Sequence, residues 1–380
     1  MRAYLSSKDC NLEQLAQQVE RQLTHKEVPQ AHEIKDNVPI YDIGRLDLNC
    51  DTETLRSEWA DVLHNTAGVL ILKNAYTNTG SIDAASVIFN QIIADEKVAS
   101  DNKADHFAVS GANDRIWNSA QKLCQYNPLV FAQYFGNLAI DTACKAWLGP
   151  NYQMTSQINL VRPTGAAQHP HRDYHLGFQS REVAASYPAH VHDLSPLLTL
   201  QGAIAHVDMP IKSGPTKLLP FSQIFRHGYL AFTQAEFRAY FEEHHVQVPL
   251  AKGDVLFFSP ALYHAGGENV SFDIHRMANL LQVSSAFGRP METLDRLDMT
   301  KRLYKVLCAR DHDLTPREID AAISACSEGY AFPTNLDTDP PIGGLAPETQ
   351  AALCRRALTT GMAVAEFNAA LDAQVARQEP

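Results

Sequence analysis

Apolar residues in the first 150 positions recur mostly at the spacing of helices. Four stretches place them three or four positions apart, so that they share one helical face: residues 12–23, 55–63, 82–93 and 131–138. Asn127 followed by Pro128 is typical of a helix start. An apolar run at 67–72 predicts a buried strand, and residues 105–118, which show no period, predict a loop. The pattern therefore indicates a mostly helical region over residues 1–150.

The pattern changes after position 150, where short apolar runs are separated by turn residues. Four runs predict strands: 153–161, 197–208, 254–259 and 274–285. Because helices do not alternate with these strands, a doubly wound parallel sheet is disfavoured, and a sandwich or jelly roll is favoured. We therefore expect an α+β protein with a β core between helical ends.

Helical patterns return after position 290. Thr315 and Glu318 have the spacing of a capping box, and Pro316 suits the first helical position between them. Residues 337–344 must interrupt the helices. The expected organisation is one domain over 1–290, with a mostly helical region at 1–150 and a core at 151–290, and a helical extension 291–380 packed on that core.

Composition and charge exclude several classes of partner. The chain has 380 residues and a net charge of −11, without a stretch basic enough to follow a phosphate backbone, so we expect no nucleic-acid partner. It lacks an apolar run of about 18 residues and a signal-peptide pattern, so we expect no membrane partner and a cytoplasmic location. Its seven cysteines form no C-x-x-C pair and are odd in number, which disfavours a disulfide framework or a zinc knuckle.

The most informative motif is His171-Arg172-Asp173. Side chains alternate along an extended segment, so His171 and Asp173 project to the same side. His264 follows the apolar run at 255–258, where the end of a strand can present it. Two imidazoles and one carboxylate form the facial donor set of non-haem Fe(II) oxygenases, which leaves coordination positions open. We therefore predict a catalytic metal site of His171, Asp173 and His264.

Other histidines in the same segment keep a second interpretation open. His169, His171 and His175 share the parity of Asp173, so three of these histidines could form a zinc site, and the protein would then be a zinc-dependent hydrolase. A third interpretation is a jelly-roll binding module that lacks catalysis. The intact set of His171, Asp173 and His264, followed by Arg276, argues against that last interpretation.

Two strands carry candidate residues for a co-substrate. Arg276 lies on a mostly apolar strand face, where an unpaired guanidinium would be costly, so it requires either an internal ion pair or a bound carboxylate. Gln157 and Asn159 share one face of strand 153–161. That polar face could line a pocket or simply meet water. Beside a candidate iron site, we favour binding of a 2-oxo acid by Arg276.

Five stretches resemble the phytanoyl-CoA dioxygenase family of Fe(II)/2-oxoglutarate oxygenases: SQINLVRPTG, HPHRDYH, SGPTKLLPFSQ, KGDVLFFSPALYHAGGEN and HRMANLLQ. The resemblance implies a double-stranded β-helix, a cupin-like jelly roll with iron between its two sheets. It implies Fe(II) at His171, Asp173 and His264, the distal carboxylate of 2-oxoglutarate at Arg276, and contact of Asn159 with that co-substrate.

The sequence departs from the family pattern in two places. Gly266 stands where Ser is frequent, so one hydrogen bond to 2-oxoglutarate is expected to be missing. Residues 220–223 (PFSQ) replace the usual Pro-Gly-Ser-His, which is expected to reshape the adjoining loop.

The resemblance also implies the reaction class. With O2 and 2-oxoglutarate, such an enzyme hydroxylates or otherwise oxidises a small molecule and releases succinate and CO2. Asp173 favours hydroxylation, because related halogenases lack this carboxylate. Trp117, Tyr174, Phe178 and the loop at 105–118 are candidates for the substrate side. The expected assembly is a monomer or homodimer, and the sequence does not identify the substrate.

Overall fold

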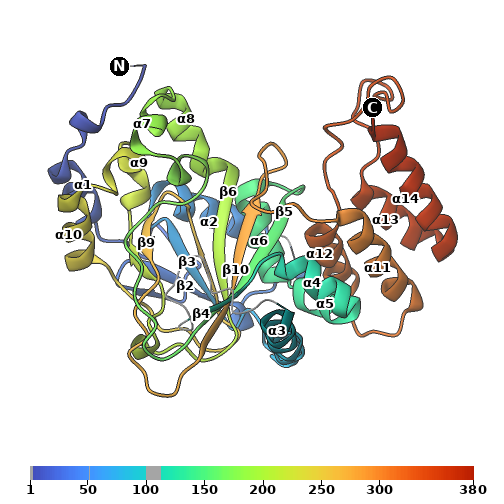
Figure 1. Ribbon diagram of the computed structural model, residues 1–380, viewed down its shortest axis with the longest axis horizontal. Coiled ribbons are helices and arrows are strands. Elements are labelled where there is room, and N and C mark those ends of the chain that lie inside the picture. The colour runs from blue at the N-terminus through green and yellow to red at the C-terminus, as the bar shows by residue number, and fades with distance from the viewer. Residues whose placement is uncertain (1–2, 51, 100–112) are drawn as a thin grey trace.

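The computed structural model describes residues 3–50, 52–99 and 113–380 (Figure 1). The strands within these residues are β1 (Glu33–Lys35), β2 (Val38–Asp42), β3 (Val69–Lys73), β4 (Asn113–Ile116), β5 (Gln153–Val161), β6 (Thr199–Ala205), β7 (Lys217–Leu219), β8 (Val255–Phe258), β9 (Tyr263–Ala265) and β10 (Arg276–Ser284).

The α-helices lie before, between and after these strands. They are α1 (Leu12–Val19), α2 (Glu53–Asn65), α3 (Gly80–Ala99), α4 (Ser119–Tyr126), α5 (Pro128–Phe135), α6 (Leu138–Leu148), α7 (Arg181–Ala185), α8 (Ala189–Leu194), α9 (Gly228–Ala231), α10 (Ala235–His244), α11 (Arg296–Ala309), α12 (Pro316–Cys326), α13 (Gln350–Thr360) and α14 (Val364–Gln378). No helix in the described ranges is both long and apolar enough to cross a membrane.

One large sheet forms the centre of the molecule. Over the described residues its strand order is β1-β2-β3-β8-β6-β10-β5-β4, and β7 pairs with β9 in a smaller sheet. Neighbouring strands are antiparallel except β2 and β3, which are parallel and are joined through α2. A large sheet opposed by a small one, with helices before and after, is the α+β jelly-roll architecture that the sequence predicts.

Alternation along the central strands separates the core from a cavity. Strand β10 pairs with β5 from Arg276 opposite Val161 to Ser284 opposite Gln153, and with β6 on its other edge. Met154 and Ile158 of β5 are fully buried in the hydrophobic core, whereas Gln157 and Asn159 line a cavity. Of the two alternatives that the sequence left open, the polar face of β5 therefore lines a pocket and does not simply meet water.

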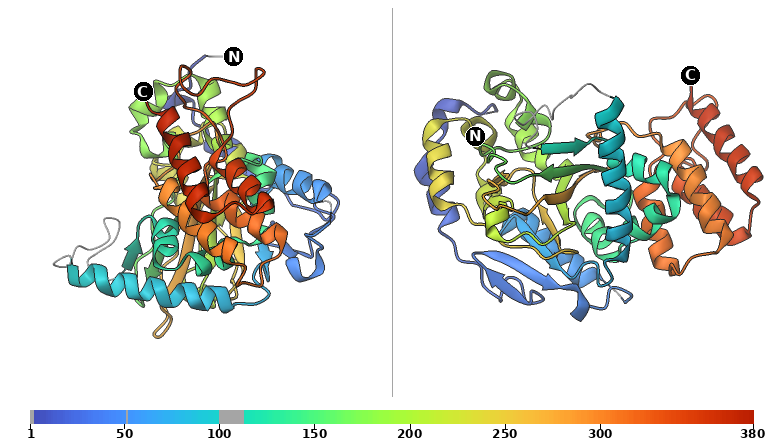
Figure 2. Two further views of the ribbon diagram at one scale, coloured as in Figure 1. Left: turned by 90° about the vertical axis from the view of Figure 1, so that its right-hand side faces the viewer. Right: turned by 60° about the horizontal axis from the view of Figure 1, so that its bottom comes forward.

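Helices cover the core face of the large sheet. Helices α4 and α6 contact β5 and β6, and the C-terminal helices α11 and α12 pack on α4, α5 and α6 (Figures 1 and 2). Arg296 at the start of α11 donates to the carbonyl of Met154 in β5. Among the described residues that line the cavity, Met291 is the last in the sequence. The C-terminal helices thus support the outside of the core, and the division at residue 290 remains a prediction.

Local signals predicted several helix ends correctly. Thr315 and Glu318 form the complete capping box of α12, and the Asn127 side chain caps α5. The periodic series at 12–23 and 131–138, however, do not run their full length. Helix α1 ends at Val19, because the backbone N–H of Leu23 instead donates to the side chain of Asn37. The second series divides at Gly136 into α5 and α6.

Five strands and several helices were not predicted, and two of these strands, β7 and β9, have only three residues each. Strand β2 is almost entirely buried, so it shows no alternation, and β1 is only three residues long. Strand β4 occupies residues 113–116 of the stretch predicted as a loop, whose residues 105–112 lie outside the described ranges. Helices α7 to α10 lie inside the predicted β core, where short apolar stretches at 181–244 give no clear helical period.

Both ring nitrogens of His206, which is buried in the core, have hydrogen-bond partners. His206 lies at the end of β6, and its Nδ1 and Nε2 atoms hydrogen-bond the hydroxyls of Ser86 and Tyr134 at 2.8 and 2.7 Å. Burial lowers the pKa of His206 to about 3. This histidine is therefore neutral and structural.

Candidate metal and co-substrate site

A cavity of about 1020 Å³ lies between the two sheets. The large sheet contributes Gln157, Asn159, Gln201 and Arg276, and the small sheet contributes His264. This volume is at the upper end of the range for small-molecule sites. The cavity is therefore large enough for a co-substrate together with a second small molecule.

His171, Asp173 and His264 converge at one side of this cavity. The Nε2 atoms of His171 and His264 lie 3.6 and 3.5 Å from the two carboxylate oxygens of Asp173. Within residues 3–50, 52–99 and 113–380, they form the one group of three or more His, Cys, Asp or Glu side chains whose donor atoms lie within 4.8 Å of one another. The three residues predicted as a site therefore come together.

Backbone hydrogen bonds bring the two distant segments side by side. The N–H of His171 donates to the carbonyl of His264 at 3.0 Å, and the reverse bond measures 3.2 Å. The N–H of Asp173 donates to the carbonyl of Pro260 at 3.0 Å. Residue 171 makes only an isolated bridge and does not belong to a regular strand, yet the segment is extended enough for both side chains to face the cavity.

Hydrogen bonds select the imidazole tautomers. Nδ1 of His171 lies 2.8 Å from the carbonyl of His169, and Nδ1 of His264 lies 2.9 Å from the carbonyl of Leu262. Because a carbonyl only accepts, the proton of each neutral ring is on Nδ1. The Nε2 lone pairs are then free to face Asp173 and a metal, as in carbonyl-supported histidine ligands.

The charge states also suit metal binding. Burial would raise the pKa of Asp173, but the neighbouring imidazoles of His171 and His264 and the hydrogen bond from Gln201 outweigh it, and the pKa falls well below its usual range. Burial, and then the nearby His264, lower the pKa of His171. At neutral pH the site therefore presents one carboxylate and an unprotonated imidazole at His171.

The alternative histidine cluster is not assembled. After Asp173 the chain turns through Tyr174 and His175, whose φ angles are 61° and 40°. His175 begins a short 3-10 helix, and its Nδ1 lies 3.2 Å from the Ser195 hydroxyl. The parity that aligns His169, His171 and His175 on a straight strand is lost at this turn. The geometry therefore gives the zinc-hydrolase interpretation no site.

Arg276 is buried without a carboxylate partner in the described segments of the chain. Its Nη1 donates to the carbonyls of Ser213 and Gly267 at 3.1 and 3.2 Å, and burial lowers its pKa to about 10. The internal ion pair that the sequence left open is therefore not formed by these residues. A guanidinium in this state favours an anionic ligand.

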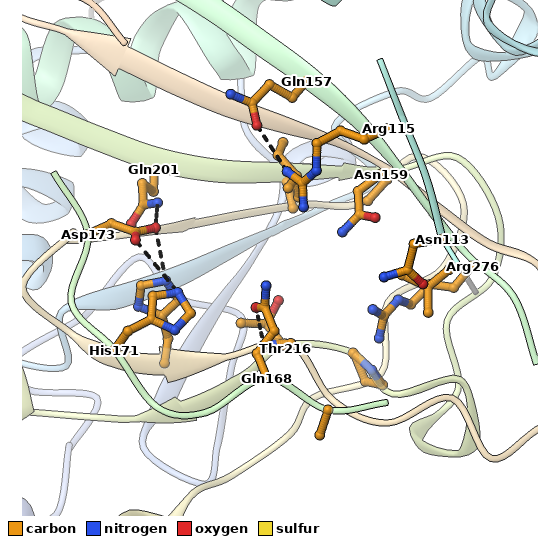
Figure 3. A pocket seen from close by; sticks show the side chains of 18 of the residues that line it. Asn113, Arg115, Gln157, Asn159, Gln168, His171, Asp173, Gln201, Thr216 and Arg276 are labelled. Atoms are coloured by element: carbon orange, nitrogen blue, oxygen red, sulfur yellow. Dashed lines mark hydrogen bonds and ion pairs between the residues drawn. The ribbon is translucent and has the colours of Figure 1, made fainter. Parts of the chain in front are cut away.

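Arg276 and the metal donors lie on opposite sides of the pocket, with Gln168 between them in the view of Figure 3. The buried Oδ1 atom of Asn159, also in this pocket, has no hydrogen-bond partner among the described residues. A dicarboxylic 2-oxo acid could reach a metal with one end and Arg276 with the other. The residues present therefore fit 2-oxoglutarate as well as a ferrous ion.

Gln157 is more engaged than the sequence predicts. Its Oε1 accepts from Nη1 of Arg115 at 3.0 Å (Figure 3). Its Nε2 donates to Oε1 of Gln282 at 3.1 Å. The Arg115 guanidinium also lies 5.1 Å from the centre of the Trp117 ring. Gln157 therefore serves at least partly to hold Arg115 at the cavity wall.

Sequence reasoning missed two glutamines of the site. Nε2 of Gln201 donates to Oδ2 of Asp173 at 2.5 Å and so orients the carboxylate. Oε1 of Gln168 accepts from the N–H of Gly266 at 3.0 Å, and a Cβ at Gly266 would lie 3.0 Å from the same oxygen. Gln168 thus occupies the space beside Gly266 where a serine side chain would project.

The candidates for the substrate side are only partly brought to the cavity. Trp117 and Phe178 line it, whereas Tyr174 is 2% exposed and lies behind the wall. Residues 105–112 of the predicted loop lie outside the described ranges. In place of the Pro-Gly-Ser-His pattern, Phe221 adopts a φ of 69° and Gln223 donates to the carbonyl of Thr66.

One family model and several solved structures are similar to this chain. The family model for phytanoyl-CoA dioxygenase matches residues 50–278, which is more than half of the chain. No curated protein matches significantly. Similar solved structures include the non-heme alpha-ketoglutarate-dependent epimerase SnoN from nogalamycin biosynthesis, with 16% identity and a TM-score of 0.41 over 61% of this chain and 82% of that one.

Two further solved structures have similar scores. The non-heme alpha-ketoglutarate-dependent carbocyclase SnoK, also from nogalamycin biosynthesis, is 18% identical, with a TM-score of 0.44 over 63% of this chain and 85% of that one. AviO1 from Streptomyces viridochromogenes Tue57 is 18% identical, with a TM-score of 0.41 over 62% of this chain and 97% of that one.

Proposed function

The chain belongs to the phytanoyl-CoA dioxygenase family, and from this premise we propose that it hydroxylates a small organic molecule and releases succinate and CO2. It is a 2-oxoglutarate-dependent non-haem iron oxygenase, and its donor set of two imidazoles and one carboxylate is the one that ferrous ion takes in such enzymes. Iron, 2-oxoglutarate and O2 together supply the oxidising power when bound. The protein's own residues then bind, orient and exclude water.

We assign a role to each residue that faces the reacting groups. His171 and His264 would hold Fe(II) through Nε2, because their Nδ1 atoms are occupied by carbonyls. Asp173 would supply the third ligand, and its carboxylate favours hydroxylation over halogenation. Arg276 would bind the distal carboxylate of 2-oxoglutarate, and Asn159, which lines the same cavity, would donate to that molecule from its side-chain Nδ2.

One observation carries this proposal. Three donors from segments almost a hundred residues apart meet within 4.8 Å, in the same cavity as a buried arginine that has no carboxylate partner among the described residues. A binding module without catalysis has no need of this combination. The cavity also leaves room for the organic molecule that would be oxidised.

The assignment can be tested in two measurements. Anaerobic addition of Fe(II) and 2-oxoglutarate should give a weak visible charge-transfer band, and succinate should form when O2 and ascorbate are added. Asp173→Ala and His264→Ala should abolish both signals, because each removes a ligand. His275→Ala is a matched control, since this exposed histidine lies beside Arg276 without facing the metal group. Full succinate formation by Asp173→Ala would contradict the assignment.

A further inference from the structure

Arg172 lies between two of the proposed ligands and points away from them. Because side chains alternate along the extended segment, its side chain enters the opposite side, where it is 2% exposed. The guanidinium carbon lies 5.2 Å from the ring centre of Tyr229 and 5.0 Å from that of Tyr263. The cation is therefore enclosed between two aromatic residues.

Backbone groups complete the enclosure. Nη2 of Arg172 donates to the carbonyls of Ser222 and Phe225 at 2.5 and 2.9 Å. A Cβ on Gly228 would lie 1.8 Å from the guanidinium carbon, so only glycine leaves space for this position of the side chain. We call the surrounding set the arginine socket: Ser222, Phe225, Gly228, Tyr229 and Tyr263.

The arginine socket touches the backbone of both ligand segments. The N–H of Tyr263, the residue before His264, donates to Oγ of Ser222 at 2.8 Å, and its hydroxyl donates to the carbonyl of Gly228 at 3.2 Å. The hydroxyl of Tyr229 lies 3.4 Å from the carbonyl of Asp173, to which it can donate. One buried cation therefore joins the segments that carry Asp173 and His264.

The absence of a counter-charge makes this arrangement unusual. None of the described carboxylates forms an ion pair with Arg172. A buried cation without a carboxylate is costly, and the ring faces and carbonyls compensate only while the guanidinium keeps this one position. The rest of Arg172, including the backbone between His171 and Asp173, is then fixed as well.

We propose that Arg172 is a positioning residue, which locks the His171–Asp173 segment against the His264 segment so that the three donors keep their metal-binding geometry. The inference rests on the proposed function, in which these three residues hold the metal. Residues that orient metal ligands typically change metal affinity by about 10–100-fold when they are altered. The effect should therefore be visible in metal affinity itself, apart from turnover.

A titration of the 380-residue chain with Co(II), monitored by calorimetry and by visible absorption, tests this proposal. Arg172→Met keeps a long side chain but loses both hydrogen bonds, and we expect the Co(II) Kd to rise about 10–100-fold. Arg172→Lys retains a charge and should recover some of this loss. Gly228→Ala retains the arginine but displaces the guanidinium, and should raise the Kd about tenfold.

Arg296 supplies a matched control. It is also buried and donates to two carbonyls, those of Cys326 and Met154, at 3.0 Å each, but it lies in α11 and makes no hydrogen bond to the described residues of the metal group or arginine socket. Arg296→Met should lower the unfolding midpoint without changing the Co(II) Kd. A purely structural role for Arg172 predicts the same behaviour for both arginines.

Each result decides the question. Wild-type affinity in Arg172→Met or Gly228→Ala, or equal weakening in Arg296→Met, would overturn the positioning role. If Arg172→Met, Arg172→Lys and Gly228→Ala all give insoluble protein while Arg296→Met stays soluble, the positioning role is also overturned, and Arg172 is instead required for folding. If the wild-type chain fails to bind Co(II), or His264→Ala binds it equally well, the proposed function fails instead.

Discussion

Replacement of Arg276 by methionine should remove the enzyme's preference for a dicarboxylic co-substrate. Methionine has a similar length and no donor, so the change deletes the groups that would hold the distal carboxylate of 2-oxoglutarate. The chelating end of the co-substrate, which would bind the metal, does not involve Arg276. Binding should therefore weaken only for acids that carry a second carboxylate.

The size of the effect follows from the state of Arg276 in the free protein. A fall in pKa from 12.5 to about 10 corresponds to roughly 3 kcal/mol of desolvation, which folding has already imposed. Two charge-assisted hydrogen bonds to a carboxylate contribute about 3–6 kcal/mol together. Because folding has already desolvated the guanidinium, the cost of its desolvation subtracts little from this binding free energy. 2-Oxoglutarate should therefore bind about 10²–10⁴-fold more weakly to Arg276→Met.

The stability of the variant should change much less. Removing the buried cation relieves about 3 kcal/mol, but the carbonyls of Ser213 and Gly267 each lose a donor, at about 1–3 kcal/mol apiece. These contributions nearly cancel. A urea melt should therefore show a similar midpoint for both proteins, and a change in binding can be assigned to the lost contact.

The assay is an anaerobic titration of the Fe(II) protein with 2-oxoglutarate and with 2-oxobutyrate, read from the visible charge-transfer band. 2-Oxobutyrate has the same chelating end and no distal carboxylate. The wild-type chain should prefer 2-oxoglutarate by the factor given above, and Arg276→Met should bind both acids similarly. A variant that still prefers 2-oxoglutarate, or that loses both acids equally, would refute the reasoning.

Three further outcomes follow from other contacts. Gln201→Ala removes a charge-assisted hydrogen bond worth about 1.5–3 kcal/mol to Asp173, so the Co(II) Kd measured by calorimetry should rise at least tenfold, and an unchanged Kd would contradict this orienting role. His206 is neutral in the folded state down to a pH of about 3, whereas its unfolded form takes up a proton below about 6.5, so stability should fall as the pH drops through this window. Between pH 6.5 and 5 this difference in protonation lowers the free energy of unfolding by about 2 kcal/mol. Guanidinium melts of His206→Gln should lack this loss, and an unchanged pH dependence of stability would exclude His206 as its cause. Thr315→Ala breaks the capping box with Glu318 and should cost about 1 kcal/mol in a urea melt, and no loss would show that the cap is redundant.

The elements that the sequence predicted are those whose signal is local. The capping box at Thr315 needs only four consecutive residues, and the alternation of apolar and polar residue types along β5 is set by that strand's own two faces, one toward the core and one toward the cavity. Strand β2 was missed because both of its faces are buried, which removes alternation. Strand β4 was missed because Asn113 and Arg115, which line the cavity, are polar, and only Ile116 of its four residues is apolar.

The predicted site shows the same limit. His171, Asp173 and His264 were proposed from an H-x-D motif, a later histidine that is followed by Arg276, and the family resemblance that these residues carry. Gln201 could not be assigned, since its partner lies 28 positions away and becomes a neighbour only when the segment at 171–173 packs over β6. The surroundings of Arg172 depend on two further segments, and a single sequence does not reveal such a meeting.

The nine-residue pairing of β5 with β10 places an unusual constraint on how this protein can evolve. Asn159 and Arg276 face the cavity only because each strand keeps its present frame, and residues of the opposite parity fill the core. Inserting or deleting a single residue in either strand would exchange the two sets and so damage folding and catalysis at once. New substrate preferences should therefore arise from changes in length outside this strand pair, while inside it only substitutions can accumulate.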